Sequence, residues 1–145
     1  MKRSFLLFCL SLLVSFSTQA QVKNDYNSFQ SGEWLRYRLH YGFLNASYAT
    51  LSLKDTVYGG AEAYHVIGEG RTTGFASLFF KVEDIYQSIF SVKPIRPIHF
   101  RRDIDEGGYT KDISIDFNFD AQTALITNNK TASSFVIPIH RQIQD

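Results

Sequence analysis

Apolar and polar side chains alternate along most of the chain after residue 30, and this period of two is the feature that most restricts the fold. Between residues 33 and 43, large apolar or aromatic side chains occupy the odd positions, and the even positions include Arg36, Arg38 and His40. Successive side chains of a β-strand point to opposite faces, so this alternation is typical of a strand with one covered face. The sequence therefore predicts a mostly β protein.

Further segments show the same pattern or a short apolar run, and turn signals separate them. They are residues 49–53, 63–67, 82–90, 95–104, 109–119, 124–127 and 134–140. The pair Gly59-Gly60 is typical of a two-residue hairpin turn, because glycine accepts positive φ. Pro94 and Pro97 restrict the start of the fifth strand to an edge or a bend. We therefore predict an antiparallel meander that forms a curved sheet, a half-barrel or a barrel.

The pair Gly107-Gly108 allows two registers for the hairpin of residues 95–119. A two-residue loop places Phe100 opposite Ile115, and a four-residue loop shifts the pairing by two. Both keep the same residues on each face, because the side-chain period is two. The apolar face then carries Arg102 and Lys111 near the hairpin tip, together with Ile98, Phe100, Ile113, Ile115 and Phe117. The other face carries His99, Arg101, Asp103, Asp112 and Asp116.

One segment breaks the alternation. Phe75, Leu78 and Phe79 recur at helical spacing, which predicts one or two helical turns that a threonine caps, lying across the sheet or a barrel mouth. Three interpretations of residues 75–80 remain open: a plug in the core, a lid over a cavity, or an exposed patch. Of these three interpretations we favour the plug first and the lid second.

The first twenty residues have the composition of a secretory signal peptide. Lys2 and Arg3 precede an apolar run over residues 5–14, and small residues follow it. The run is too short for a membrane-spanning helix. We therefore expect a soluble mature chain that begins at Gln21, works outside the cytoplasm and has no transmembrane segment. Cys9 lies inside the apolar run and not after it, which argues against a lipoprotein.

Residues 21–145 are enough for one ordinary core, and no repeat or linker divides them, so we predict a single β domain. Without the leader, the chain has no cysteine, so its stability depends on packing. It also has 13 basic residues against 14 acidic ones and no block of like charge. This balance argues against nucleic acid as a partner.

The titratable residues do not assemble into a recognisable catalytic or metal site. The four histidines lie too far apart in sequence for a zinc or facial-triad motif: His40, His65, His99 and His140. His99 faces Asp116 in the two-residue register, but no serine stands in a nucleophile elbow. Glu83 and Asp84 point to opposite faces of one strand. We therefore predict a protein that is not an enzyme and uses no metal or cofactor.

Four runs resemble the exported bacterial family known as domain of unknown function 3108 (DUF3108). They are residues 32–37, 41–46, 72–84 and 101–109. The resemblance implies a periplasmic or outer-envelope protein with a mostly antiparallel sheet, and it implies no activity and no catalytic residues. Members of that family typically run longer, so we expect either a fragment of a longer protein or a shortened member, with a domain that is incomplete at its C-terminal end.

Aromatic side chains suggest a function. The chain contains 13 Phe and 8 Tyr, which either fill a core or line the interior of a curved sheet. Our preferred hypothesis is non-catalytic binding of an apolar or amphipathic, lipid-like envelope component. The tail is expected along Leu39, Phe100, Ile115 and Phe117, the headgroup near Arg102 and Lys111, and the lid at Phe75 and Phe79.

Two interpretations that require no ligand compete with this hypothesis. Arg102 and Lys111 can simply extend to water from the end of a hairpin. The aromatic side chains can form a solid core. The alternative function is therefore a structural or protein-interaction module of the cell envelope with no small ligand.

Overall fold

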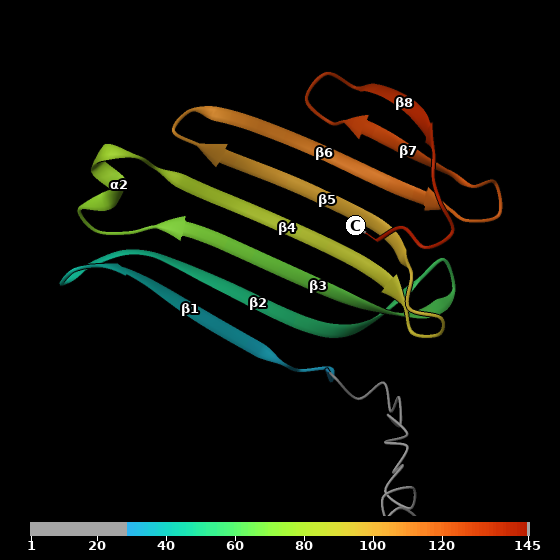
Figure 1. Ribbon diagram of the computed structural model, residues 1–145, viewed down its shortest axis with the longest axis horizontal. Helices are drawn as coiled ribbons and strands as arrows, with labels where there is room; N and C mark the ends of the chain where they lie inside the picture. The colour runs from blue at the N-terminus through green and yellow to red at the C-terminus, as the bar shows by residue number, and fades with distance from the viewer. Residues whose placement is uncertain (1–28, 145) are drawn as a thin grey trace, which may run out of the picture.

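The computed structural model describes residues 29–144, and the predicted signal peptide lies outside these residues. The eight strands form one antiparallel sheet in chain order (Figure 1). They are β1 (Trp34–Tyr41), β2 (Leu44–Tyr58), β3 (Ala61–Thr72), β4 (Val82–Ser91), β5 (Pro97–Glu106), β6 (Tyr109–Asn118), β7 (Thr123–Asn128) and β8 (Ser133–Pro138). The sheet is curved, but β1 and β8 do not meet, so the prediction of an open curved sheet is confirmed and the closed barrel is not formed.

The strand boundaries follow the turn signals of the sequence. Gly59 and Gly60 have φ values of +60° and +84° and join β2 to β3. Glu106 pairs with Tyr109, so the loop at Gly107-Gly108 has two residues, and the first of the two predicted registers is correct. Pro97 begins β5, which is a central strand, and the register between β4 and β5 shifts at this end. The prolines therefore mark a bend and not an edge.

Cross-strand pairing assigns the side chains to two faces. The apolar face carries Leu35, Tyr37, Leu39, Leu51, Leu53, Tyr64, Val66, Tyr86, Phe90, Phe100, Ile104, Ile113, Ile115, Phe117, Ala124, Ile126, Phe135 and Ile137. The polar face carries Trp34, Arg36, Tyr48, Thr50, Glu69, Arg71, Glu83, Arg101, Asp103, Asp112 and Asp116 among others. The period-two prediction of the faces is therefore confirmed for the hairpin of β5 and β6.

The apolar face is only partly covered by the described residues. Phe29 packs edge-on against Tyr64 and Phe90 at one end of the sheet. At the β1 edge, by contrast, Leu35, Tyr37 and Leu39 remain 47%, 55% and 52% exposed. The buried apolar residues within 29–144 are few: Leu53, Ala63, Pro97, Ile104, Ala124 and Ile139. Within these residues the aromatic side chains do not fill a closed core.

The predicted helix forms between β3 and β4, at one end of the sheet (Figure 1). It is α2 (Ala76–Phe79), and Phe75 is its N-cap without a side-chain hydrogen bond. The expected threonine cap is therefore wrong: the hydroxyl of Thr72 instead accepts a hydrogen bond from the backbone N–H of Val82 at 2.9 Å. No helical residue is buried, so the plug interpretation is also wrong. Among the helices of the described residues, none is long and apolar enough to cross a membrane.

Candidate ligand-binding face

Three of the residues predicted to contact a ligand tail lie together on the apolar face. Phe100 of β5 pairs with Ile115 of β6, and Phe117 is the next residue of β6 on the same face. The ring of Tyr86 in β4 extends the cluster, with its centroid 6.5 Å from that of Phe100. These side chains form a continuous apolar strip across three neighbouring strands.

Leu39 lies on the same face but is separated from this strip. It belongs to the edge strand β1, whereas Phe100 lies on β5, the fifth strand of the sheet. Neighbouring strands lie about 4.8 Å apart, so the two strands are separated by roughly 19 Å along the sheet. A tail that runs along β5 therefore contacts Phe100 but does not reach Leu39. Leu39 belongs to a second part of the apolar face.

The two predicted headgroup residues have acidic neighbours that the sequence pattern did not indicate. Arg102 pairs with Ile113, and Lys111 pairs with Ile104, which places both cations on the apolar face. Asp84 of β4 pairs with Ile104 on the same face, and Glu106 lies two residues further along β5. We call Asp84, Arg102, Glu106 and Lys111 the mixed-charge cluster.

Asp84 is the most perturbed member of the mixed-charge cluster. Burial raises the pKa of Asp84 and the carboxyl of Glu106 raises it further, whereas a hydrogen bond from the backbone of Asp105 and the charge of Arg102 offset part of this. Its Oδ1 atom is buried and has no hydrogen-bond partner in the described part of the chain. The cluster therefore has both charge signs, and its cations are partly compensated before any ligand arrives.

The exposed helix lies at the same end of the sheet as the mixed-charge cluster. The backbone N–H of Gly107 donates a 2.7 Å hydrogen bond to the carbonyl of Lys81, just after α2. Phe75 and Phe79 pack edge to face with their ring centroids 4.9 Å apart, and both are largely exposed. This position agrees with a lid or an exposed patch.

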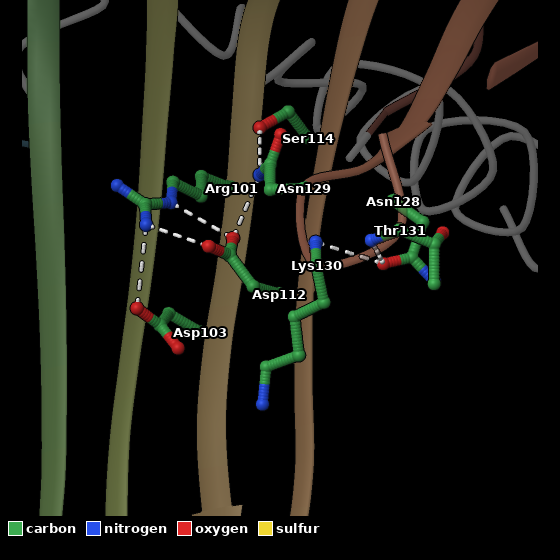
Figure 2. Close-up of polar contacts among 8 residues, drawn as sticks. All are labelled: Arg101, Asp103, Asp112, Ser114, Asn128, Asn129, Lys130 and Thr131. Atoms are coloured by element: carbon green, nitrogen blue, oxygen red, sulfur yellow. Dashed lines mark hydrogen bonds and ion pairs between the residues drawn. The ribbon is translucent and has the colours of Figure 1, made fainter. Parts of the chain in front are cut away.

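The polar face contains a hydrogen-bonded network centred on Asp112 (Figure 2). Arg101 binds both carboxylate oxygens of Asp112, with Nε–Oδ1 and Nη2–Oδ2 distances of 3.0 and 2.8 Å. The Nδ2 atom of Asn129 donates to Asp112 Oδ1 at 2.7 Å and to the hydroxyl of Ser114 at 2.8 Å. The bidentate bond from Arg101 lowers the pKa of Asp112 despite its burial. This network joins β5, β6 and the turn after β7.

The predicted pair of His99 and Asp116 is confirmed. The Nδ1 atom of His99 lies 2.7 Å from Asp116 Oδ1, and the ring of Tyr58 stacks on the imidazole at 6.2 Å. His65 forms a separate 3.1 Å hydrogen bond with Gln87. Within residues 29–144, no three His, Cys, Asp or Glu side chains are grouped closely enough to hold a metal ion. Both histidines act as polar cross-strand contacts in this arrangement.

Asp112 and Asp84 are expected to change stability with opposite signs as the pH changes. A carboxyl with a lowered pKa stabilises the fold above its unfolded pKa of about 4, and this contribution is lost as the pH falls through the folded pKa. A carboxyl with a raised pKa favours the folded state when protonated, so it destabilises the fold as the pH rises. Asp112→Asn should therefore lower the free energy of unfolding at about pH 7 by about 1–2 kcal/mol, and Asp84→Asn should raise it or leave it unchanged.

Urea unfolding at about pH 7 and about pH 3 measures both effects. The deficit of Asp112→Asn should shrink at the lower pH, where the wild-type carboxyl also approaches protonation. The free energy of unfolding of Asp84→Asn should also approach that of the wild type at the lower pH, because the wild-type carboxyl of Asp84 is protonated there. A loss of stability of similar size in both variants at neutral pH would contradict these assignments.

Comparison with known proteins agrees with the resemblance found in the sequence. A family model described as "Protein of unknown function (DUF3108)" matches residues 36–145. The matched region includes nearly all of the sheet, α2, the apolar strip and the whole mixed-charge cluster. No curated protein and no solved structure matches the chain.

Proposed function

We propose that this chain, which belongs to the DUF3108 family, is an exported, non-catalytic envelope protein that binds an apolar or amphipathic component on its apolar face. The leader-like residues 1–20 support export to the periplasm or outer envelope. The observation that carries the binding proposal is the incomplete cover of the apolar face: its β1 edge is exposed, and the strip at Phe100, Ile115 and Phe117 is half-buried.

An exposed face of this kind favours a bound partner for a physical reason. Burial of apolar surface contributes about 25 cal/mol per Å², and isolated proteins rarely expose contiguous apolar patches larger than a few hundred Å². The strip of Tyr86, Phe100, Ile115 and Phe117 crosses three neighbouring strands on one face, which suits an acyl chain. The mixed-charge cluster beside Ile104 supplies a polar end for a headgroup.

The proposed site is tested with a fluorescent long-chain fatty acid and the corresponding long-chain alcohol, titrated into the mature chain. We expect both ligands to bind the wild type. Replacing Arg102 and Lys111 together with Ser should weaken the acid about tenfold, equivalent to 1.4 kcal/mol, and leave the alcohol unchanged. The loss is modest because Asp84 and Glu106 already compensate the two cations.

A matched pair of variants separates the two faces. Phe117→Ser should weaken both ligands, because it removes apolar contact area from the strip. Val136→Ser, on the polar face of the edge strand β8, should weaken neither. Failure of the wild type to bind either ligand would contradict the proposal, as would equal losses in the two variants.

The alternative function is a protein-interaction module. Two observations favour it: the edge strands β1 and β8 pair on one side only within the described residues, and the side chains of α2 are exposed. An unpaired strand edge is a template for another strand. Absence of lipid binding together with a stable complex that a proline in β1 abolishes would support this alternative.

A further inference from the structure

A second concave site lies on the polar face, opposite the proposed lipid-binding face. A groove of about 640 Å³ extends from β1 to β5, and its volume falls within the usual range for small-molecule sites. Its lining includes Trp34 and Arg36 from β1, Tyr48 from β2, Glu83 from β4, and Asp103 and Asp105 from β5. We call it the polar-face groove.

One end of the polar-face groove is aromatic. The side chain of Trp34 is 58% exposed, although it is the type of side chain that proteins usually cover. Beside it, the guanidinium of Arg36 lies over the ring of Tyr48, 4.3 Å from the centroid. The indole of Trp34 therefore offers a flat, accessible apolar surface next to a hydrogen-bond donor.

The opposite end supplies hydrogen-bond acceptors, and two of its carboxylates, those of Glu83 and Asp103, lie close to cations. Lys81 Nζ lies 2.9 Å from Glu83 Oε2, and Arg101 Nη2 lies 3.3 Å from Asp103 Oδ2. This compensation reduces the attraction of the groove for a free cation. The carboxylates nevertheless keep further lone pairs that can accept hydrogen bonds.

A carbohydrate matches both ends of the groove. Sugar rings present a C–H surface that packs on a flat aromatic ring, and their hydroxyl groups both donate and accept hydrogen bonds. Hydroxyls can therefore donate to Asp103 or Asp105 and accept from Arg36 without bringing a net charge. Five neighbouring strands span roughly 19 Å, which is long enough for several linked sugar rings.

We propose that the polar-face groove binds a neutral oligosaccharide, with one sugar ring on Trp34 and hydroxyl groups on the carboxylates of β4 and β5. This proposal does not depend on the proposed apolar-face function, because its main contacts are Trp34 and the carboxylates of the polar face, although Asp84 and Ile104 also line the groove. A basic peptide is the main competitor, and the cations in and beside the groove argue against it: Arg36, Arg71, Lys81 and Arg101.

The single tryptophan of the chain provides a direct measurement, because all tryptophan emission comes from Trp34. The mature protein is titrated with cello-, malto- and chito-oligosaccharides and, separately, with an oligolysine peptide. We expect a saturable change in emission with at least one of the oligosaccharides, and none with oligolysine. No response to any oligosaccharide at millimolar concentration, or a response to oligolysine alone, would overturn the proposal.

Calorimetry extends the test to variants that lack the fluorophore. Trp34→Ala should weaken the responding oligosaccharide at least tenfold, and Trp34→Phe should retain part of the affinity because an aromatic ring remains. Phe135→Ala removes an exposed aromatic ring from the other face and should bind like the wild type. Circular dichroism establishes that each variant is folded, and equal affinities for Trp34→Ala and Phe135→Ala would overturn the assignment.

Discussion

Replacing Ile104 with Asp is expected to lower the free energy of unfolding by about 2–4 kcal/mol, or to prevent folding. Ile104 is 4% exposed on the apolar face of the central strand β5, between Asp84 on one side and Lys111 on the other. A carboxylate at this position would lose its hydration and lie close to the carboxyls of Asp84 and Glu106. Lys111 can compensate only part of that cost, so the loss should be large.

Urea unfolding followed by circular dichroism measures this loss, and Val136→Asp is its control. Val136 lies on the polar face of the edge strand β8 and is 60% exposed, so the same new charge should cost about 0.5 kcal/mol or less. Equal effects at the two positions would show that the apolar face is not buried around Ile104, and the mixed-charge cluster would then be fully hydrated.

The sheet could be predicted from local sequence because its pattern is local. Alternation reports the face of each strand, and glycine pairs report the turns, so each strand and the shared face of Phe100 and Ile115 follow without knowledge of the rest of the chain, whereas their direct pairing was one of two registers. The bend at Pro97 was one of two alternatives, because proline lacks the backbone N–H and is therefore restricted to edge strands, strand starts and bulges, without indicating which of these applies.

The sites depend on pairing between strands, which no local pattern reports. Asp84 is close to Arg102 only because β4 pairs with β5 in one register, and Trp34 shares a groove with Asp103 only because the sheet curves over five strands. The mixed-charge cluster could have been predicted from the alternation of faces once a register was assumed for β4 and β5. The groove required the curvature itself.

The helix shows a different reason for failure. Residues 75–80 are apolar, and we expected them to be buried, but apolar composition does not require burial. The threonine expected to cap the helix bonds instead to Val82, ten residues further along the chain. Both errors arise because the helix is positioned by contacts with strand ends that are distant in sequence.

Gly107→Ala is expected to have the second-largest effect on the free energy of unfolding. The Gly107-Gly108 turn also contacts the segment that follows α2. Gly107 has a φ of +60°, which strains any residue with a Cβ. An alanine Cβ would in addition clash with Cε2 of Phe80, so the ring would have to move. Strain and the displaced ring together should cost about 2–3 kcal/mol, the ring contributing less than a fixed core side chain because it is half exposed.

Gly59→Ala is the matched control for this change. Gly59 has the same φ of +60° in an equivalent two-residue turn, but a Cβ there meets no atom within 4 Å. It should cost about 1 kcal/mol, from backbone strain alone. Because Phe80 follows α2 directly, Gly107→Ala should also increase proteolysis between Gly74 and Lys81, whereas Gly59→Ala should not. Equal stability losses without a difference in proteolysis would show that Phe80 does not hold the helix against this hairpin. The lid interpretation of Phe75 and Phe79 would then have no contact that positions the helix.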